Sequence, residues 1–127
     1  MPPTAPTYSS ADASAAKSRA CAAWEVTSST MAQASRSAGA APSDWTDPQT
    51  RAAHGYEART ALVESSLLES QVGPATPPEL ATAIHDYLVA TFDQEDATMR
   101  RVGSRVNAAV DRSNAAVDRV NAACGFA

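Results

Sequence analysis

A seven-residue repeat in the last fifth of the chain is the feature that most constrains its fold. The segment Asn-Ala-Ala-Val-Asp-Arg occurs at 107–112 and again at 114–119, and Asn-Ala-Ala-Cys follows at 121–124. Apolar and small residues within it recur at alternating spacings of four and three, as in a helix that packs lengthwise on other helices. These seam residues are Val106, Val110, Ser113, Val117, Val120 and Cys124. The repeat therefore predicts a long packed helix that stops at Gly125.

The third copy of the repeat carries Cys124 where the first two carry valine, and the chain has one other cysteine, Cys21. Because both cysteines lie at seam positions, we interpret them as a disulfide between the first and last helices. Such a bond implies an oxidising compartment outside the cytoplasm. The alternative is a pair of buried free thiols, which would suit a cytosolic protein. The chain has no CxxC motif, which argues against thiol–disulfide catalysis.

Composition indicates a single lean domain. The chain has 127 residues, and alanine supplies much of its 44% hydrophobic content, so helices form readily but bury little bulk. A domain of this kind benefits from a covalent link between its helices. The net charge of −4 argues against nucleic-acid binding, which needs a basic face. The sequence contains no run of about 18 apolar residues, which is the length that a helix needs to span a membrane.

Proline, glycine and capping residues divide the chain into four helices. Ser9 with Asp12 resembles a capping box, Asp47-Pro48 and Thr76-Pro77 each combine a cap with a first-turn proline, and Gly39 and Gly73 are expected stops. The expected segments are a Pro/Thr-rich linker at 1–9, a helical domain at 10–125 and a tail at 126–127. The expected helices span 10–38, 48–72, 77–102 and 104–124.

Each of the first three helices carries its own expected buried stripe. The first comprises Cys21, Trp24, Ser28, Met31, Ser35 and Ala38. The second comprises Ala53, Tyr56, Thr60, Val63, Leu67 and Ser70. The third comprises Leu80, Ile84, Tyr87, Leu88 and Thr91, continued by Met99 and Val102.

The end of the third helix is ambiguous in the sequence. It could break at Gly103, break in the acidic segment 93–96, or continue unbroken to Cys124. An unbroken helix of about 70 Å would carry Cys124 far from Cys21, whereas a disulfide needs Cα atoms roughly 5.5 Å apart. A break at Gly103 returns the last helix to the start of the first. We therefore predict an all-α, antiparallel up-down four-helix bundle closed by a disulfide between its first and last helices.

Histidines and carboxylates supply weak candidates for cofactor or metal chemistry. His54 and His85 each precede a tyrosine by two positions, Tyr56 and Tyr87, and such side chains can ligate haem iron. Residues two apart do not share a helix face, so we expect one member of each pair in the core and the other in solvent. The favoured interpretation is a solvated histidine beside a core tyrosine.

The acidic residues Asp93, Glu95 and Asp96 lack the pattern of a calcium loop, and neither histidine follows a glutamate by three residues as in a di-iron bundle. We expect them to form a solvated face. No metal site, no cofactor and no catalytic motif is expected, so the protein is predicted not to be an enzyme.

The candidate interface residues are Trp45, Arg112 and Arg119. Trp45 lies in a loop and is either an exposed anchor for a partner or a plug at the end of the bundle. Arg112 and Arg119 follow aspartates at a seven-residue spacing, beside the seam. They are either part of a stripe that binds a partner or ordinary surface ion pairs.

A loose pattern of motifs runs through most of the chain: Tyr8-Ser-Ser-Ala-Asp12, Ala-Ala-Lys17 before Cys21, Thr76-Pro77 before Leu80-Ala-Thr-Ala-Ile84, and the closing Cys124. In these features the chain resembles the extracytoplasmic part of alanine- and proline-rich single-pass membrane proteins of mycobacteria and related actinobacteria. The resemblance implies an exported helical domain, carries over no catalytic residues, and implies an N-terminal membrane anchor that these 127 residues lack.

The function expected from these observations is that of an exported or membrane-anchored cell-envelope domain that binds or scaffolds another protein. The alternative is a carrier of haem or a lipid, with a cavity lined by Met31, Tyr56 or Tyr87. A filled core with an exposed apolar patch would favour protein binding. A cytosolic structural protein would require free thiols. The specific partner and the oligomeric state are not indicated by the sequence.

Overall fold

Within residues 6–126, which the computed structural model describes, the chain forms four helices and no strand. Their bounds are α1 at Ser10–Gly39, α2 at Pro48–Ser70, α3 at Pro78–Arg100 and α4 at Gly103–Cys124. The predicted all-α four-helix bundle is confirmed. Part of the expected linker, residues 1–5, and the last residue of the expected tail lie outside the described residues.

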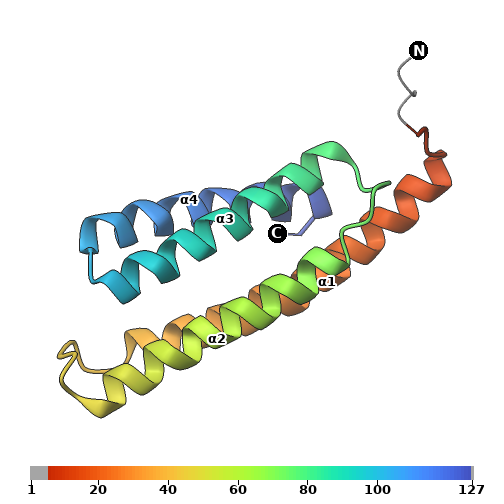
Figure 1. The fold of residues 1–127 in the computed structure, drawn as a ribbon. Coiled ribbons are helices and arrows are strands. Elements are labelled where there is room, and N and C mark those ends of the chain that lie inside the picture. Colours follow the sequence, from red (N-terminus) through yellow and green to blue (C-terminus); the bar gives the residue numbers. More distant parts are fainter. Residues whose placement is uncertain (1–5, 127) are drawn as a thin grey trace.

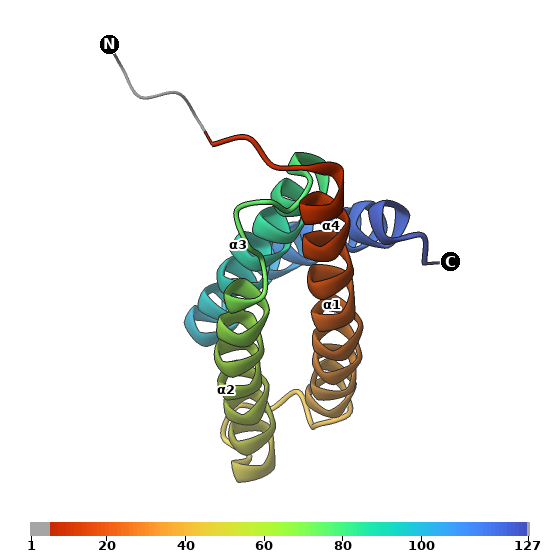
Figure 2. The ribbon, with the colours of Figure 1, turned by 90° about the vertical axis from the view of Figure 1, so that its right-hand side faces the viewer.

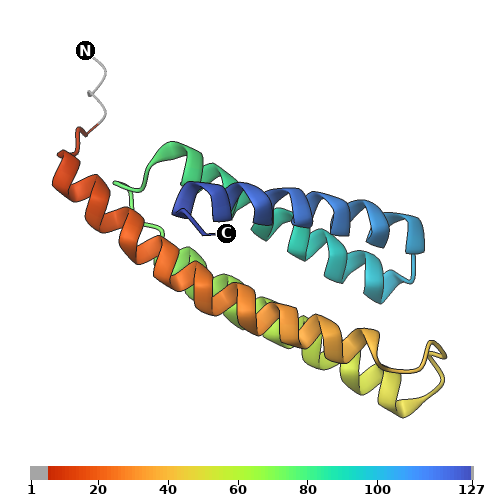
Figure 3. The same ribbon diagram turned by 180° about the vertical axis from the view of Figure 1, so that it is seen from behind.

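The bundle consists of two antiparallel hairpins, α1–α2 and α3–α4, stacked on one another (Figure 1). The loop between α1 and α2 and the turn between α3 and α4 lie at the same end of the molecule, as Figures 1 and 3 show from opposite sides. We call this the tip end and the opposite one the disulfide end. Seen along the hairpins, α3–α4 crosses α1–α2 obliquely (Figure 2).

Side-chain caps begin the first two helices. The Ser9 hydroxyl accepts a hydrogen bond from the Asp12 backbone N–H at 3.0 Å, and the Asp12 carboxylate accepts one from the Ser9 N–H at 3.2 Å. Asp47 caps α2 by accepting from the Gln49 N–H at 2.8 Å, ahead of the proline at the first helical position. The expected cap at Thr76 is wrong, because α3 begins after Pro77 without a side-chain cap.

The predicted break between α3 and α4 is present, but a different residue makes it. Arg101 adopts the left-handed conformation with φ 60°, and the Val102 N–H donates to the Ala97 carbonyl at 3.0 Å. This is the usual way in which a helix ends in a left-handed residue, here without glycine. Gly103, expected to stop α3, is instead the first residue of α4.

A disulfide joins Cys21 of α1 to Cys124 of α4, with Cα atoms 5.7 Å apart. The predicted link between the first and last helices is therefore confirmed. Beside it, Trp24 is fully buried and meets the edge of the Tyr87 ring, with ring centroids 4.7 Å apart. The Trp24 indole N–H donates to the Asn121 side-chain oxygen at 2.8 Å. The cluster around these residues comprises Ala20, Leu68, Leu80, Ala83, Ile84, Leu88, Ala116 and Val120.

Small side chains fill the contacts within the hairpins. At seven-residue spacings, α3 buries Ala83, Ala90 and Ala97, and α4 buries Ala109 and Ala116. The valines of the α4 repeat, expected at the centre of the seam, are only half-buried apart from Val120. Alanine lets two helix backbones approach closely, so the alanines occupy the centre of the contact and the valines flank it.

The register predicted for α2 is wrong by about one residue. Tyr56, Val63 and Leu67 were expected in the core but are each more than half exposed. One residue corresponds to about 100° of rotation around a helix, so a different side of α2 faces the interior. The buried residues of α2 are Thr50, Glu57, Ala61, Ser65 and Leu68. In α3, Met99 is likewise exposed rather than buried.

Loss of the disulfide should lower the stability of the fold substantially. The two cysteines are 103 residues apart, and the chain-entropy argument gives on the order of 4 kcal/mol for closing a loop of that size. We expect urea unfolding of a Cys21→Ala/Cys124→Ala double variant to show a free energy of unfolding lower than that of the oxidised protein by about that amount. A reducing agent should lower the stability of the natural chain and leave the variant unchanged, and equal midpoints for all samples would contradict the prediction.

Candidate functional site

Large apolar side chains are exposed mainly on α2 and α3. On these two helices the exposed set comprises Tyr56, Leu62, Val63, Leu67, Val89, Phe92 and Met99. By contrast, α1 exposes Val26, and among the described residues α4 exposes no large apolar side chain. Single exposed apolar residues need no explanation, but seven of them on two helices set α2 and α3 apart from α1 and α4.

A groove of about 350 Å³ lies between the end of α2 and the start and middle of α3. Glu69 of α2 and Val72, just after that helix, line one side, and His85, Val89 and Phe92 of α3 line the other. We call this the α2–α3 groove. Beyond it toward the tip end, Leu62 lies seven residues before Glu69 and Met99 seven residues after Phe92, and both side chains are exposed. The groove lining is thus mostly apolar, with Glu69 and His85 as its polar side chains.

The two histidine–tyrosine pairs behave differently. His85 is exposed on the groove and Tyr87 is in the core, as expected. For the other pair the expectation is reversed, since His54 is half-buried and Tyr56 is 53% exposed. The shifted register of α2 accounts for the reversal.

At the tip end, Trp45 joins the two hairpins. Its indole stacks on the His54 ring of α2, with centroids 4.7 Å apart and planes 22° apart. The Arg101 guanidinium, from the turn between α3 and α4, lies over the Trp45 ring with its carbon 4.9 Å from the centroid. This cation–π contact links the α1–α2 loop to the α3–α4 turn. That arrangement matches a plug at the end of the bundle, and a role for Trp45 in a partner interface stays a prediction.

Two carboxylates are buried between the hairpins. Glu57 of α2 is 4% exposed and Glu95 of α3 is 9% exposed, and the Glu95 Oε2 atom has no hydrogen-bond partner. The pKa of Glu95 is raised from its ordinary value of 4.5 to about 8. The largest cause is burial, followed by the negative charge of Glu57 and a hydrogen bond with Glu57. Two ionised carboxylates cannot donate to each other, so near neutral pH the pair holds one proton.

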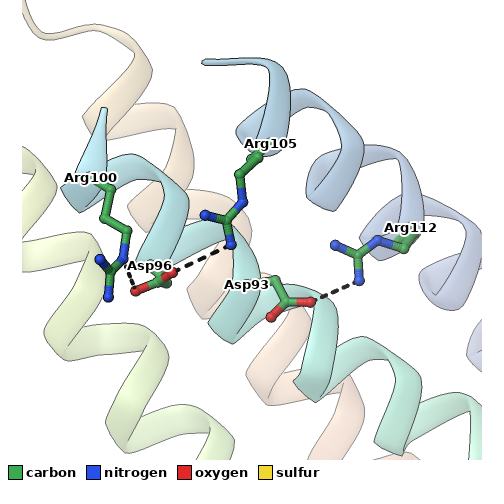
Figure 4. Close-up of polar contacts among 5 residues, drawn as sticks. All are labelled: Asp93, Asp96, Arg100, Arg105 and Arg112. Carbon is green, nitrogen blue, oxygen red and sulfur yellow. Dashed lines mark hydrogen bonds and ion pairs between the residues drawn. The ribbon is translucent and has the colours of Figure 1, made fainter. Parts of the chain in front are cut away.

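The rest of the expected acidic face is solvated and paired with arginines (Figure 4). Asp93 accepts from Arg112 of α4 at 2.8 Å, and Asp96 accepts from Arg100 at 2.9 Å and lies 3.8 Å from Arg105. The expectation that Glu95 belongs to this solvated face is wrong, because Glu95 points into the bundle.

Arg119 forms a further cross-helix ion pair, with Asp86 of α3 at 2.9 Å. Arg112 and Arg119 thus tie α4 to α3 through two exposed pairs, each worth less than about 1 kcal/mol. Both side chains remain more than half exposed, so a partner interface at these residues stays a prediction.

Within residues 6–126 no group of three or more His, Cys, Asp or Glu side chains is placed to hold a metal ion. Over the same described part of the chain, no helix combines the length and apolar character needed to cross a bilayer. The described surface offers an apolar groove and an aromatic and cationic cluster at the tips.

The sequence did not identify the buried carboxyl pair, because the large residues of α2 suggested the wrong helix side. The signal that could have found it is a second stripe of small residues on α2. Thr50, Ala61 and Ser65 share a side with Glu57, and Glu95 lies seven residues after the buried Leu88.

The model of one protein family, described as the Rv2240c four-helix bundle domain, matches residues 4–125. This match covers nearly the whole chain and agrees with the four-helix bundle found above. It carries no information on a membrane anchor or on alanine and proline content. No curated protein and no solved structure matches the chain.

The free energy of unfolding should fall as the pH rises from 5 to 8. The folded-state pKa of Glu95 is raised, so its stabilising contribution is fully present below about pH 4.5 and is lost as the pH approaches about 8. Each unit of pKa difference corresponds to about 1.4 kcal/mol. Denaturant melts at several pH values should show the decline in the natural chain and a flatter profile in Glu95→Gln.

The matched control for that measurement is Asp96→Asn, which removes an exposed carboxylate of the same helix. It should keep the pH profile of the natural chain. If Glu95→Gln and Asp96→Asn gave the same profile, the buried pair would not be the source of the pH dependence.

Replacing Trp24 should weaken the disulfide-end core. Trp24→Phe removes the indole N–H that satisfies the Asn121 oxygen and leaves space beside Tyr87. We expect a loss of on the order of 2 kcal/mol in urea unfolding, from the unpaired polar atom and the lost packing. The stability loss caused by Trp24→Phe should be smaller in an Asn121→Ala background, where no acceptor is left unpaired. An equal loss in that background would mean that the whole effect comes from packing.

Proposed function

Since the chain belongs to the Rv2240c four-helix bundle family, whose function is unknown, we propose that it is an exported, non-enzymatic cell-envelope domain that binds another protein. We place the binding surface in the α2–α3 groove, and the occupant is an amphipathic helix of the partner. The observation that supports this most directly is the exposure of seven large apolar residues along α2 and α3.

The shape and chemistry of the groove favour a helical occupant. Exposed residues recur at seven-residue spacings along the two antiparallel helices beside the groove, Leu62 and Glu69 on α2 and Phe92 and Met99 on α3. A third helix with apolar residues at positions i, i+3 or i+4, and i+7 would match that spacing. Glu69 has no ion-pair partner in the part of the chain that the structure describes, so a basic residue beside the apolar stripe would complement it.

Export is supported by the disulfide. Structural disulfides persist in oxidising compartments and are rare in the cytosol, where thiols are kept reduced. The Cys21–Cys124 bond closes nearly the whole domain, so a chain in a reducing compartment would lose the link between α1 and α4. The localisation at the cell envelope, and any membrane anchor there, remain part of the proposal.

The carrier alternative has less support. Met31 and Tyr87 are packed in the interior, Tyr56 is exposed, and the α2–α3 groove is lined by other residues. Trp24 and its neighbours fill the disulfide-end core. Binding of a haem or a lipid stays a prediction without a described cavity that favours it.

Substituting a groove residue should abolish binding without unfolding the domain. A library of amphipathic helical peptides with basic flanks would be selected against the oxidised protein, and affinities measured by fluorescence anisotropy. Because Phe92 is 44% exposed and lines the groove, Phe92→Glu should weaken the selected peptides by at least about tenfold, or ~1.4 kcal/mol. Its thermal melt should stay close to that of the natural chain.

The matched control is Val26→Glu, which places the same charge on an exposed apolar residue of α1. It should leave the affinities unchanged. The proposal fails if no peptide binds, if both variants weaken binding equally, or if amide chemical-shift changes on binding map to α4 rather than to the groove.

A further inference from the structure

We propose that the Glu57–Glu95 carboxyl pair is a proton-binding site that keeps the two hairpins closed at the tip end. With one proton bound, the carboxyls hydrogen-bond across the interface between α2 and α3. When the proton leaves, the two negative charges repel, and the tips separate while the disulfide end stays together. This inference does not depend on the proposed partner.

The geometry places the pair at a junction with little other support. Glu57 and Glu95 come from different hairpins, and both side chains are at least nine-tenths buried. The Glu95 Oε2 atom is fully covered and lacks a hydrogen-bond partner. This arrangement is costly for an ionised carboxylate and tolerable for a carboxyl pair that shares a proton. Among residues 6–126, no lysine or arginine forms an ion pair with either carboxylate.

The charged side chains nearest the pair on α2 and α4 contact other groups. From α4, Arg105 and Arg112 reach the solvated aspartates of α3, not the buried pair. On α2, His54 lies one turn before Glu57 and stacks on Trp45. Glu64 lies two turns after Glu57, where its carboxylate accepts from Thr27 of α1 at 3.5 Å.

The remaining buried residues of α1 toward the tip end carry no charge. They are Met31, Ala34 and Ala38. Glu57 is therefore the charged neighbour that governs the proton on Glu95, as the direction of the Glu95 pKa also indicates.

The two ends of the bundle would respond differently. At the disulfide end, a covalent bond and the cluster around Trp24 hold the hairpins. At the tip end, no covalent bond joins the hairpins within residues 6–126, and the Arg101–Trp45 cation–π contact there is worth about 0.5–1 kcal/mol. Repulsion between two buried charges would act at this end, so separation should begin at the tips.

The chain provides a reporter at each end, because its two tryptophans are Trp24 in the disulfide-end core and Trp45 at the tips. The full-length oxidised protein would be labelled with 5-fluorotryptophan and followed by ¹⁹F NMR from pH 6 to pH 9.5, in buffers containing a chelator. We expect the Trp45 resonance to move toward its solvent-exposed position with a midpoint near pH 8, while the Trp24 resonance stays in place.

Three variants separate the sources of the shift. Glu95→Gln keeps the size and hydrogen-bonding capacity of the side chain and should abolish the transition near pH 8, and Glu57→Gln should lower its midpoint or abolish it. Asp96→Asn, which removes an exposed carboxylate of the same helix, should leave the transition unchanged.

Several outcomes would overturn the proposal. One is a Trp45 resonance that does not move above pH 7, and another is a transition that persists unchanged in Glu95→Gln and Glu57→Gln. A third is a simultaneous shift of Trp24 and Trp45, which would mean that the whole bundle opens together. Loss of the transition in both carboxyl variants, with Trp24 unmoved in the natural chain, would support it.

Discussion

The junction between the two hairpins is the constraint on which the rest of the structure depends. Each hairpin is held internally by close contacts between small side chains, which need no bulky core. Between the hairpins, the Cys21–Cys124 bond and the Trp24 cluster concentrate the attachment at one end. The other end relies on a shared proton and on Arg101 over Trp45. The hairpins are therefore joined covalently at the disulfide end, whereas at the tip end their contact depends on the proton shared by Glu57 and Glu95.

Much of this architecture could be predicted from the sequence, because its signals are local. Capping at Ser9 and Asp47, the stop at Gly125 and the seam that carries Cys124 depend on a few neighbouring residues. The break near Gly103 was predicted because an unbroken helix would have carried Cys124 too far from Cys21 for a disulfide. That Arg101 makes the turn could not be foreseen, since an arginine in the left-handed conformation has no sequence pattern of its own.

The interior of α2 could not be predicted, for a physical reason. Sequence periodicity assumes that the largest apolar residues are buried, but on α2 the buried side is mostly small or polar, with Leu68 as its one large apolar residue. Thr50, Ala61 and Ser65 face inward because they allow close packing, and Tyr56 and Leu67 are left outside. That reversal hid the Glu57–Glu95 pair and left large apolar side chains on the surface of α2.

The positions of the chain ends have a practical consequence. The described residues begin before α1 and finish after α4, and both ends lie away from the hairpin tips (Figure 1). A fluorophore, a solid support or a fused protein joined at either end would therefore leave the tips facing outward and unobstructed. Immobilised in that orientation, the domain could be probed with ligands or by mechanical force from its less firmly joined end.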